Sequence, residues 1–414
     1  MTTPQNNKSR LVIFDVEGVL IPKNRYFLEI GKSLGFSQSV RIILYGFLYE
    51  LGLISLESAL KHVFKLFKGI KIEELLRILK KVPLMPDAQG VFEKLRIQGW
   101  KTALISSGLP TVVVKDLAST LKADFAFGLE LETKNDVLTG EIWGDVIKHN
   151  GKFKVLSRIL QTEGITPKDC IVVADDRNNA SIFLRETLKI GYNPDFLIRT
   201  IADNVVTGKL LDIMPLVGGK PKKESSPSKN DIFREAVHAS AFFVPAVSSL
   251  IGFYTFALIT LTVTILYVIS EFGRMEKRSL PLISSVTHRA VSQTELHEFA
   301  TAPIFFALGI LLTLMAFPAP TSSAAIAIFA LGDSAASFFG GLFRGLTLPF
   351  NKGKTLAGST IGFFFAFLGG LFFISPLGAL VGAAIAMIIE CLPLPVNDNL
   401  AIPLITGAAL AFIV

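Results

Sequence analysis

The order of apolar and polar residues divides this chain into two halves. Up to about residue 230, charged and apolar residues are mixed as in globular α/β proteins, whereas apolar runs and small residues dominate 236–414. In the first half, short apolar runs that end in polar residues predict strands at Arg10–Phe14, Trp100–Ile105 and Cys170–Ala174. We therefore predict a globular α/β domain followed by an all-α membrane domain.

Helices and a hairpin are predicted between these strands. Residues 26–82 carry helical periodicity, and the segment Ile72–Leu79 shows the i, i+3, i+4, i+7 spacing of one helix face. The turn signal NDVLTG within Phe125–Ile147 predicts a β-hairpin, and a further helix is predicted at Lys152–Gln161.

The second half predicts a series of membrane-spanning helices. Apolar length places them at 236–252, 253–270, 299–317, 322–342, 360–375, 377–392 and 400–414. Several of these stretches are shorter than the roughly 20 residues of a full span, so their number is fixed only to within one or two.

Basic residues indicate the orientation of this half. The segment Gly218–Asn230, GGKPKKESSPSKN, has the composition of a flexible basic linker, and segments 271–298 and 343–358 also carry lysine and arginine. If Ala236–Ser270 forms a helical hairpin, all three lie on the cytoplasmic face of the cell membrane and the C-terminus lies outside. The predicted organisation is a first, cytoplasmic domain at 1–215, a linker at 216–231 and a multi-pass membrane domain at 232–414.

Composition and charge indicate which kinds of partner the chain binds. Its 414 residues carry a net charge of +7 and a mean hydropathy of +0.53, which is too apolar for an ordinary soluble protein. The basic residues form no stripe interleaved with aromatics, so we expect no nucleic-acid partner, and the cluster before the first span suits anionic membrane lipids. Cys170 and Cys391 lie far apart and predict neither a disulfide framework nor a zinc site. The polar N-terminus leads directly into a strand, so no signal peptide is expected.

Polar residues with phosphate and metal chemistry gather where the elements of the first half end or begin. They are Asp15, Glu17, Ser106, Ser107, Lys152, Asp175, Asp176 and Asn179. The carboxyl ends of parallel strands form one sheet edge, where α/β sites lie. The four carboxylates and Asn179 form a hard-oxygen set suited to Mg²⁺. Asp15 is suited to attack phosphorus and Glu17 to protonate a leaving group, while the two serines and Lys152 are predicted to hold phosphoryl oxygens.

Residues 10–205 resemble the haloacid dehalogenase-like phosphatases, most closely the phosphoserine phosphatase-like branch, with four motifs in order. The resemblance implies the following roles: nucleophile Asp15, acid/base Glu17 where most members have Asp, second motif Ser106, third motif Lys152, and magnesium ligand Asp175. In ADDRNN, Asp176 replaces a glycine and Asn179 an acid of the family's GDGxND. The helical segment at about 22–84 looks like the family's cap. The implied fold is a Rossmann-like α/β fold with a helical cap.

A hydrophilic segment, Gly332–Ser359, interrupts the apolar second half. Ionisable groups at membrane depth are costly and usually mark a site, and lysines and glycines suit phosphate binding. We expect Asp333 and Lys354 to be catalytic and Lys352 and Ser359 to bind phosphate. Further candidates near the predicted spans are His238, Glu271, Arg274, Glu298, Glu390, Asp398 and Asn399.

Residues 232–414 resemble the CTP-dependent polyprenol kinases, which include dolichol kinase and phytol kinase. The resemblance rests on FREAVHASA, ISEFGRM, LGDSAASFFGG with NKGKTLAGS, and NDNLAIPL. Compared with the family's GKSxEGS, Thr355 replaces a serine and Ala357 a glutamate. The resemblance implies CTP with Mg²⁺ as the phosphoryl donor system and a lipid alcohol as acceptor.

The leading hypothesis is a bifunctional membrane enzyme. Its second half would phosphorylate an isoprenoid or polyprenol alcohol from CTP, and its first half would hydrolyse a phosphomonoester through an aspartyl-phosphate. One alternative is a cytidylyltransferase that forms a CDP-lipid, with a fused phosphatase. Another has a phosphoserine phosphatase-like reaction as the main activity. A non-enzymatic reading, a phosphate-binding module on a transporter, lacks the internal repeat that transporters show.

Overall fold

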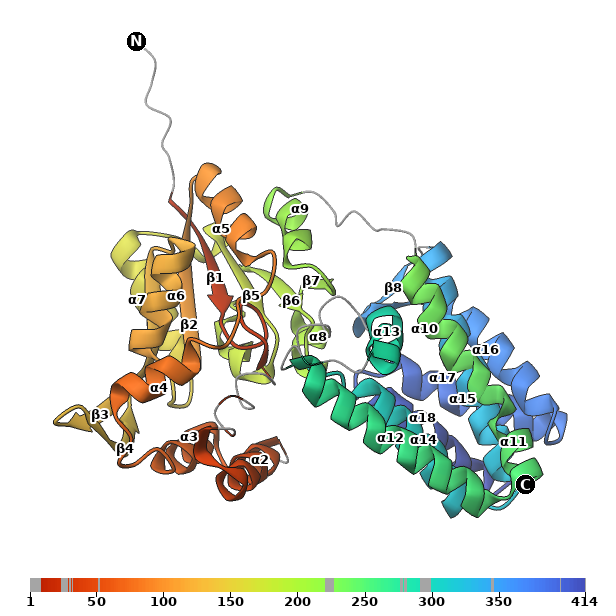
Figure 1. Ribbon diagram of the computed structural model, residues 1–414. Helices are drawn as coiled ribbons and strands as arrows, with labels where there is room; N and C mark the ends of the chain where they lie inside the picture. The colour runs from red at the N-terminus through yellow and green to blue at the C-terminus, as the bar shows by residue number, and fades with distance from the viewer. Residues whose placement is uncertain are drawn as a thin grey trace, which may run out of the picture. The chain divides into compact units, whose positions relative to one another are not determined.

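The computed structural model describes residues 9–23, 29, 31, 33–50, 53–219, 227–275, 278, 281–290, 299–343, 346–394 and 396–413. The chain forms two compact units, Met1–Lys222 and Lys223–Val414, called here the N-terminal and C-terminal units (Figure 1).

A seven-stranded sheet forms the middle of the N-terminal unit. In sheet order its strands are β4 (Val137–Trp143), β3 (Phe125–Lys134), β2 (Trp100–Pro110), β1 (Arg10–Asp15), β5 (Cys170–Ala174), β6 (Leu188–Tyr192) and β7 (Asn204–Val206). All neighbours are parallel except β3 and β4, which form the predicted hairpin with its turn at Asn135 and Asp136. The three predicted strands are confirmed, and with them the Rossmann-like α/β fold. Because β1 lies between β2 and β5, the carboxyl ends of these three strands meet at one edge.

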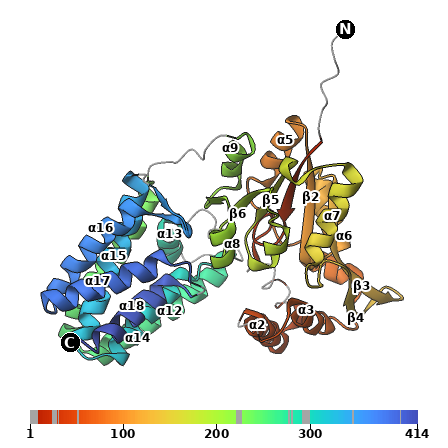
Figure 2. The ribbon, with the colours of Figure 1, turned by 180° about the vertical axis from the view of Figure 1, so that it is seen from behind.

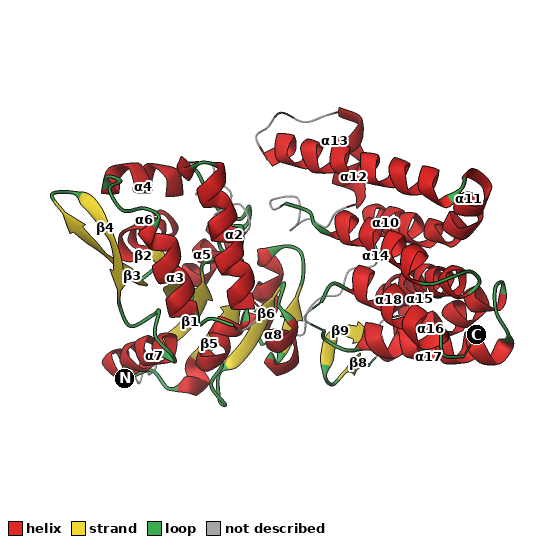
Figure 3. Ribbon diagram, turned by 90° about the horizontal axis from the view of Figure 1, so that it is seen from below, coloured by secondary structure: helices red, strands yellow, loops and turns green. Residues whose placement is uncertain are grey.

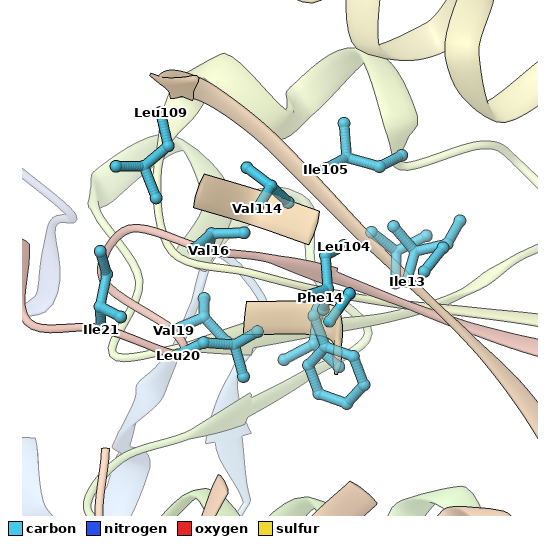
Figure 4. Close-up of a cluster of buried hydrophobic side chains, with 14 of the residues drawn as sticks. Ile13, Phe14, Val16, Val19, Leu20, Ile21, Leu104, Ile105, Leu109 and Val114 are labelled. Carbon is cyan, nitrogen blue, oxygen red and sulfur yellow. The ribbon is translucent and has the colours of Figure 1, made fainter. Parts of the chain in front are cut away.

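Helices cover this sheet. They are α5 (Ala88–Ile97), α6 (Thr111–Leu121), α7 (Gly151–Glu163), α8 (Phe196–Ile201) and α9 (Met214–Val217). The predicted helix at Lys152–Gln161 is confirmed by α7. Phe14 of β1 and Leu104 of β2 are fully buried in the core beneath them (Figure 4). A central parallel strand is buried on both faces, which is why β1 is continuously apolar in sequence.

Three helices between β1 and α5 form a cap. They are α2 (Phe36–Glu50), α3 (Leu56–Lys65) and α4 (Ile72–Leu79), and they confirm the helical prediction for the described part of 26–82. Main-chain hydrogen bonds join the cap to the hairpin, from Gly69 N to Leu138 O and from Ile72 N to Asp136 O, each 2.9 Å long. The sheet of the N-terminal unit and its cap are both visible in Figure 3.

The C-terminal unit is built almost entirely of helices, as predicted. They are α10 (Lys229–Ser240), α11 (Val244–Ile251), α12 (Phe253–Met275), α13 (Pro281–Ala290), α14 (Ala302–Ala316), α15 (Thr321–Phe343), α16 (Leu356–Leu371), α17 (Pro376–Cys391) and α18 (Asp398–Leu410). Helix α15 contacts α10, α14, α16, α17 and α18 and is therefore the central helix of this unit (Figure 2). Small residues along it, such as Ala324 and Gly332, allow these close helix contacts.

The predicted first span at 236–252 is wrong in its outline. Helix α10 ends at Ser240, a short 3₁₀ turn follows, and α11 begins at Val244. Pro245 lies in the first turn of α11, where a residue without a main-chain N–H is tolerated, whereas within one long helix it would remove a hydrogen bond. The polar face of α10 therefore belongs to a separate short helix.

Two segments predicted as loops are also partly structured. Within 271–298, α12 continues to Met275 and α13 adds a further helix. Within 343–358, strands β8 (Thr347–Leu348) and β9 (Asn351–Thr355) form an antiparallel hairpin, and α16 follows directly. Local hydrogen bonding therefore orders parts of both basic segments.

The predicted linker at 216–231 is shorter in the structure. Helix α9 extends to Val217, and α10 begins at Lys229. Ser228 caps α10 by accepting from the Asp231 main-chain N, while the Asp231 carboxylate accepts from Ser228, a reciprocal pattern that fixes a helix start.

Two described helices, α12 and α15, are long and apolar enough to cross a membrane. Of the most apolar 18 residues of α12, 6% are buried within the protein, against 56% for α15. The apolar helices α14, α16, α17 and α18 are shorter. Exposed apolar surface on a helix as long as α12 is suited to lipid, and the seven-span arrangement stays a prediction.

Candidate functional site

Asp15 is the last residue of β1, and the chain turns sharply after it. Asp15 Oδ1 accepts a hydrogen bond of 2.9 Å from the Val16 main-chain N. Gly18 has a φ of +84°, and a Cβ at this position would lie 2.1 Å from Asp175 Oδ2. Only glycine suits both this backbone conformation and this close approach. The turn therefore sets the loop after β1 against the loop after β5.

Lys152 and Asn179 hold the Asp15 carboxylate from two sides. Lys152 Nζ donates to Asp15 Oδ1 at 2.8 Å and to Asn179 Oδ1 at 2.7 Å. Asn179 Nδ2 donates to Asp15 Oδ2 and, at 3.0 Å, to Asp176 Oδ1. Burial alone would lower the pKa of Lys152, but the charges of Asp15 and Asp176 outweigh it and raise this pKa. The predicted nucleophile is thus fixed in orientation by a charged lysine.

Three carboxylates form a candidate metal site. Asp15, Asp175 and Asp176 present carboxylate oxygens that all lie within 4.8 Å of one another. Asp175 Oδ1 is buried and has no hydrogen-bond partner within the described part of the chain. Burial raises the pKa of Asp175 well above its ordinary value, and the charges of Asp176 and Asp15 add to this effect. A buried carboxylate oxygen without a partner, among hard oxygen donors, fits Mg²⁺.

Glu17 lies outside this group of three and faces the end of β2 instead. Its Oε1 accepts hydrogen bonds of 2.9 Å from Ser106 Oγ and from the Gly108 main-chain N. Its Oε2 is buried and, among the described residues, has no hydrogen-bond partner. Burial, with the Asp15 charge nearby, raises the pKa of Glu17 above its ordinary value. Ser107, also predicted to bind phosphate, donates to a main-chain carbonyl at 3.2 Å.

Sequence reasoning missed Lys23, which lies against the same acids. Lys23 Nζ is 3.4 Å from Asp175 Oδ2 and forms a closer ion pair with Asp176. Burial would lower the pKa of Lys23, but Asp175 and Asp176 raise it well above its ordinary value. Burial would raise the pKa of Asp176, but Lys23 and Lys152 lower it. No spacing signal marks this lysine, because the fold joins residues 152 positions apart.

A residue of the cap reaches the loop that carries the acids. Arg177 follows Asp176 directly, and its guanidinium lies 4.6 Å from the centre of the Tyr49 ring of α2. Arg177 Nη2 also donates to the Tyr49 main-chain O at 2.7 Å, and the Tyr49 hydroxyl binds the Asn178 side chain. The cap is therefore attached to the loop that carries Asp175 and Asp176.

Comparisons with known proteins match the N-terminal part of the chain. The family model of haloacid dehalogenase-like hydrolases matches residues 12–178. A phosphoserine phosphatase of Archaeoglobus fulgidus is 30% identical over 202 residues, which are 49% of this chain and 58% of that protein. A phosphoserine phosphatase of Methanocaldococcus jannaschii is 29% identical over 196 residues, which are 47% of this chain and 91% of that protein. A solved phospho-aspartyl intermediate analogue of phosphoserine phosphatase is 26% identical, covers 52% of this chain and 100% of its own, and has a TM-score of 0.47.

The N-terminal unit resembles the haloacid dehalogenase-like hydrolases, whose family model matches residues 12–178. The two departures of this domain from GDGxND have structural roles. Asp176 pairs with Lys23 and accepts a hydrogen bond of 3.1 Å from the Asn178 main-chain N. Asn179 lies between Asp15 and Lys152 as a neutral amide, so that no further negative charge is added beside the three carboxylates.

A cavity of about 300 Å³ in the C-terminal unit brings together several predicted site residues from helices and loops far apart in sequence. It is lined by Arg234, Glu235, Val237, His238, Ala302, Pro303, Phe306, Asp333, Ser337, Lys354, Asn397, Asp398 and Asn399. His238 Nδ1 lies 3.5 Å from Asp333 Oδ2, and the His238 ring packs against Phe306 with 4.6 Å between the ring centres. The wall of the cavity therefore contains both charged and apolar side chains.

Lys354 is held by carboxylates at this cavity. Its Nζ lies 2.5 Å from Glu390 Oε1 and 4.0 Å from Asp398 Oδ2. Glu390 is almost fully buried, on α17 behind the lysine. A lysine so placed presents a fixed positive charge, as phosphate binding requires.

The remaining predictions for this unit fall elsewhere. Glu271 accepts from the Ala300 main-chain N and pairs with Arg274, away from the cavity lining. Lys352 and Ser359 are likewise outside the lining, and the Ser359 hydroxyl accepts from the Cys391 thiol at 3.2 Å. Glu298 lies outside the described residues.

Proposed function

We propose that the N-terminal unit hydrolyses a phosphomonoester through an aspartyl-phosphate on Asp15. The observation that carries the proposal is the position of Asp15 between Lys152 and Asn179, beside two further carboxylates and Glu17. An Asp15 carboxylate oxygen would attack phosphorus as the ester P–O bond breaks.

The neighbouring residues supply the other functions of this reaction. Glu17 would give its proton to the departing alkoxide and then take a proton from the attacking water, since burial favours its protonated form. Ser106 and Lys152 would hold the phosphoryl oxygens. Mg²⁺ held by Asp15, Asp175 and Asp176 would neutralise phosphoryl charge.

The relatives support a proposal for the substrate class. Proteins that match the N-terminal unit include phosphoserine phosphatases. We infer that the substrate is the phosphate ester of an alcohol, with phosphoserine as the first to test.

The test measures phosphate release by the purified full-length protein with Mg²⁺ and phosphoserine or p-nitrophenyl phosphate. Asp15→Asn should abolish release, whereas Asp116→Asn, which alters a partly exposed surface ion pair, should leave it unchanged. Acid quenching with labelled substrate should trap a hydroxylamine-sensitive label on Asp15. Equal activity of Asp15→Asn and wild type would refute the assignment.

We also propose that the C-terminal unit transfers the γ-phosphoryl group of CTP to a lipid alcohol of the polyprenol class. The supporting observation is the cavity lined by His238, Asp333, Lys354 and Asp398. Lys354 would bind the phosphates, Asp333 with Asp398 would hold Mg²⁺, and His238 would take the hydroxyl proton. The apolar wall at Phe306 suits the lipid part of the acceptor.

The assay uses γ-labelled CTP, Mg²⁺ and polyprenols in the Asp15→Asn variant, which removes hydrolysis of the product by the other unit. Label in an organic-phase product that is lost in Asp333→Asn and Lys354→Ala would support the kinase. In a parallel reaction with a lipid phosphate as acceptor, label released as pyrophosphate together with a CDP-lipid would instead support the cytidylyltransferase alternative. Full activity of both variants would refute the site.

A further inference from the structure

Helix α2 of the cap exposes apolar side chains on one face. Val40 and Leu44 lie one helical turn apart and are 49% and 51% exposed. Ile42, on the opposite face, is 3% exposed and holds the helix against the rest of the unit. Leu53, shortly after the helix, is 68% exposed. The buried face of α2 packs against the rest of the unit, so the exposed apolar side chains are not needed for that contact.

The charge of this segment fits an anionic partner. The only acidic residue in the sequence of α2 is Glu50, at its C-terminal end, and the sequence contains none from Gly31 to Tyr49. Arg41, next to Val40, is exposed on the same side of α2. An apolar helix face with a cation and without acids is typical of helices that lie in the interface of an anionic bilayer.

The C-terminal unit of the same chain contains helices suited to a membrane. The C-terminal unit contains α12 and α15, each long and apolar enough to cross a bilayer. Only residues 218–228 separate the end of α9 from the start of α10. A connection of this length spans at most roughly 40 Å. With the C-terminal unit in a bilayer, a connection of this length would limit the distance of the N-terminal unit from the membrane, and a high effective concentration would favour even a weak apolar contact.

The exposed face and the candidate active site share helix α2. Tyr49, near the end of α2, binds Arg177 and Asn178 in the loop that also carries Asp175 and Asp176. We propose that the exposed face of α2 (Val40, Arg41 and Leu44, with Leu53) binds an anionic bilayer surface, so that the N-terminal unit acts on a phosphomonoester carried by a lipid. The second part of this inference rests on the proposed phosphatase activity, and the first does not.

Membrane contact is tested with the full-length chain in nanodiscs of phosphatidylcholine and phosphatidylserine. An environment-sensitive fluorophore is attached through Leu44→Cys in a Cys391→Ser background, since the remaining Cys170 is buried. The matched control carries the fluorophore through Ile97→Cys, on α5, where the native side chain is 76% exposed. Spin-labelled lipid should quench the label at residue 44 several-fold more than the label at 97. Equal, weak quenching at both positions would overturn the proposal and leave the face to a protein partner.

Substrate class is tested with Val40→Asp and Leu44→Asp, which introduce acids at exposed positions away from the candidate active site. Hydrolysis of p-nitrophenyl phosphate should be unchanged, whereas hydrolysis of phosphatidic acid or geranylgeranyl phosphate in the discs should fall several-fold, because the contact that holds the unit at the surface is removed. Wild-type protein that hydrolyses p-nitrophenyl phosphate but neither lipid, or variants with unchanged lipid rates, would overturn the lipid assignment. Wild-type protein that hydrolyses nothing would refute the phosphatase proposal, while the quenching result still decides membrane contact.

Discussion

Glu17→Gln should slow phosphoryl transfer from an alkyl phosphate far more than from p-nitrophenyl phosphate. The glutamine has the same size, and its Oε1 retains the hydrogen bonds from Ser106 Oγ and Gly108 N. It cannot deliver a proton from the position of Glu17 Oε2, the atom without a hydrogen-bond partner among the described residues. An alkoxide leaving group needs that proton, whereas p-nitrophenolate leaves as a stable anion.

The expected loss of rate in Glu17→Gln follows from the role of Glu17 as a general acid. General acid catalysis contributes about 10²–10⁴-fold to rate, which corresponds to about 2.7–5.5 kcal/mol of transition-state stabilisation. Retention of two hydrogen bonds predicts little loss of stability, so the rate difference reports on proton transfer. Glu17→Asp keeps the carboxyl group and should retain much more activity than Glu17→Gln.

The assay measures single-turnover formation of the phosphoenzyme. Phosphoserine and p-nitrophenyl phosphate are each used as substrate, and the reaction is stopped with acid. Single turnover is needed because Glu17 would also act as the base in the second half-reaction. Its loss would therefore slow steady-state turnover of both substrates. An equal loss for the two substrates, or no loss for phosphoserine, would show that Glu17 does not protonate the leaving group.

Three further outcomes are expected. Gly18→Ala should raise the Mg²⁺ concentration needed for phosphatase activity, because its Cβ would displace Asp175 and φ is positive; an unchanged Mg²⁺ titration would contradict this. Lys152→Met should lower the free energy of unfolding by about 3–5 kcal/mol, because it leaves Asp15 buried without its cation, and Lys152→Arg much less. Both tryptophans lie in the N-terminal unit, so urea unfolding followed by their fluorescence checks it in the full-length chain. Cys170 should resist maleimide until the chain unfolds, because burial raises its thiol pKa to about 12; peptide mass spectrometry that finds the native thiol labelled would refute this.

The sequence alone determined the features that depend on local pattern. The apolar runs of β1, β2 and β5 are visible because central parallel strands are buried on both faces. Asp15 and Asp175 follow such strands, and parallel strands bring their carboxyl ends together, so their proximity was predictable. The hairpin was predictable because its turn residues, Asn135 and Asp136, tolerate positive φ.

Tertiary structure decided which charged groups meet. Lys23 reaches Asp175 across 152 positions of sequence. In the C-terminal unit, His238 meets Asp333 beside Lys354, whereas Glu271, equally plausible by its sequence position, pairs with Arg274 elsewhere. The physical reason is the same in both units. The type of a side chain sets its chemistry, and the local hydrophobic periodicity sets whether it lies in a helix or a strand. Its charged partner is decided only after packing has placed these elements, because a buried charge is costly unless it is paired.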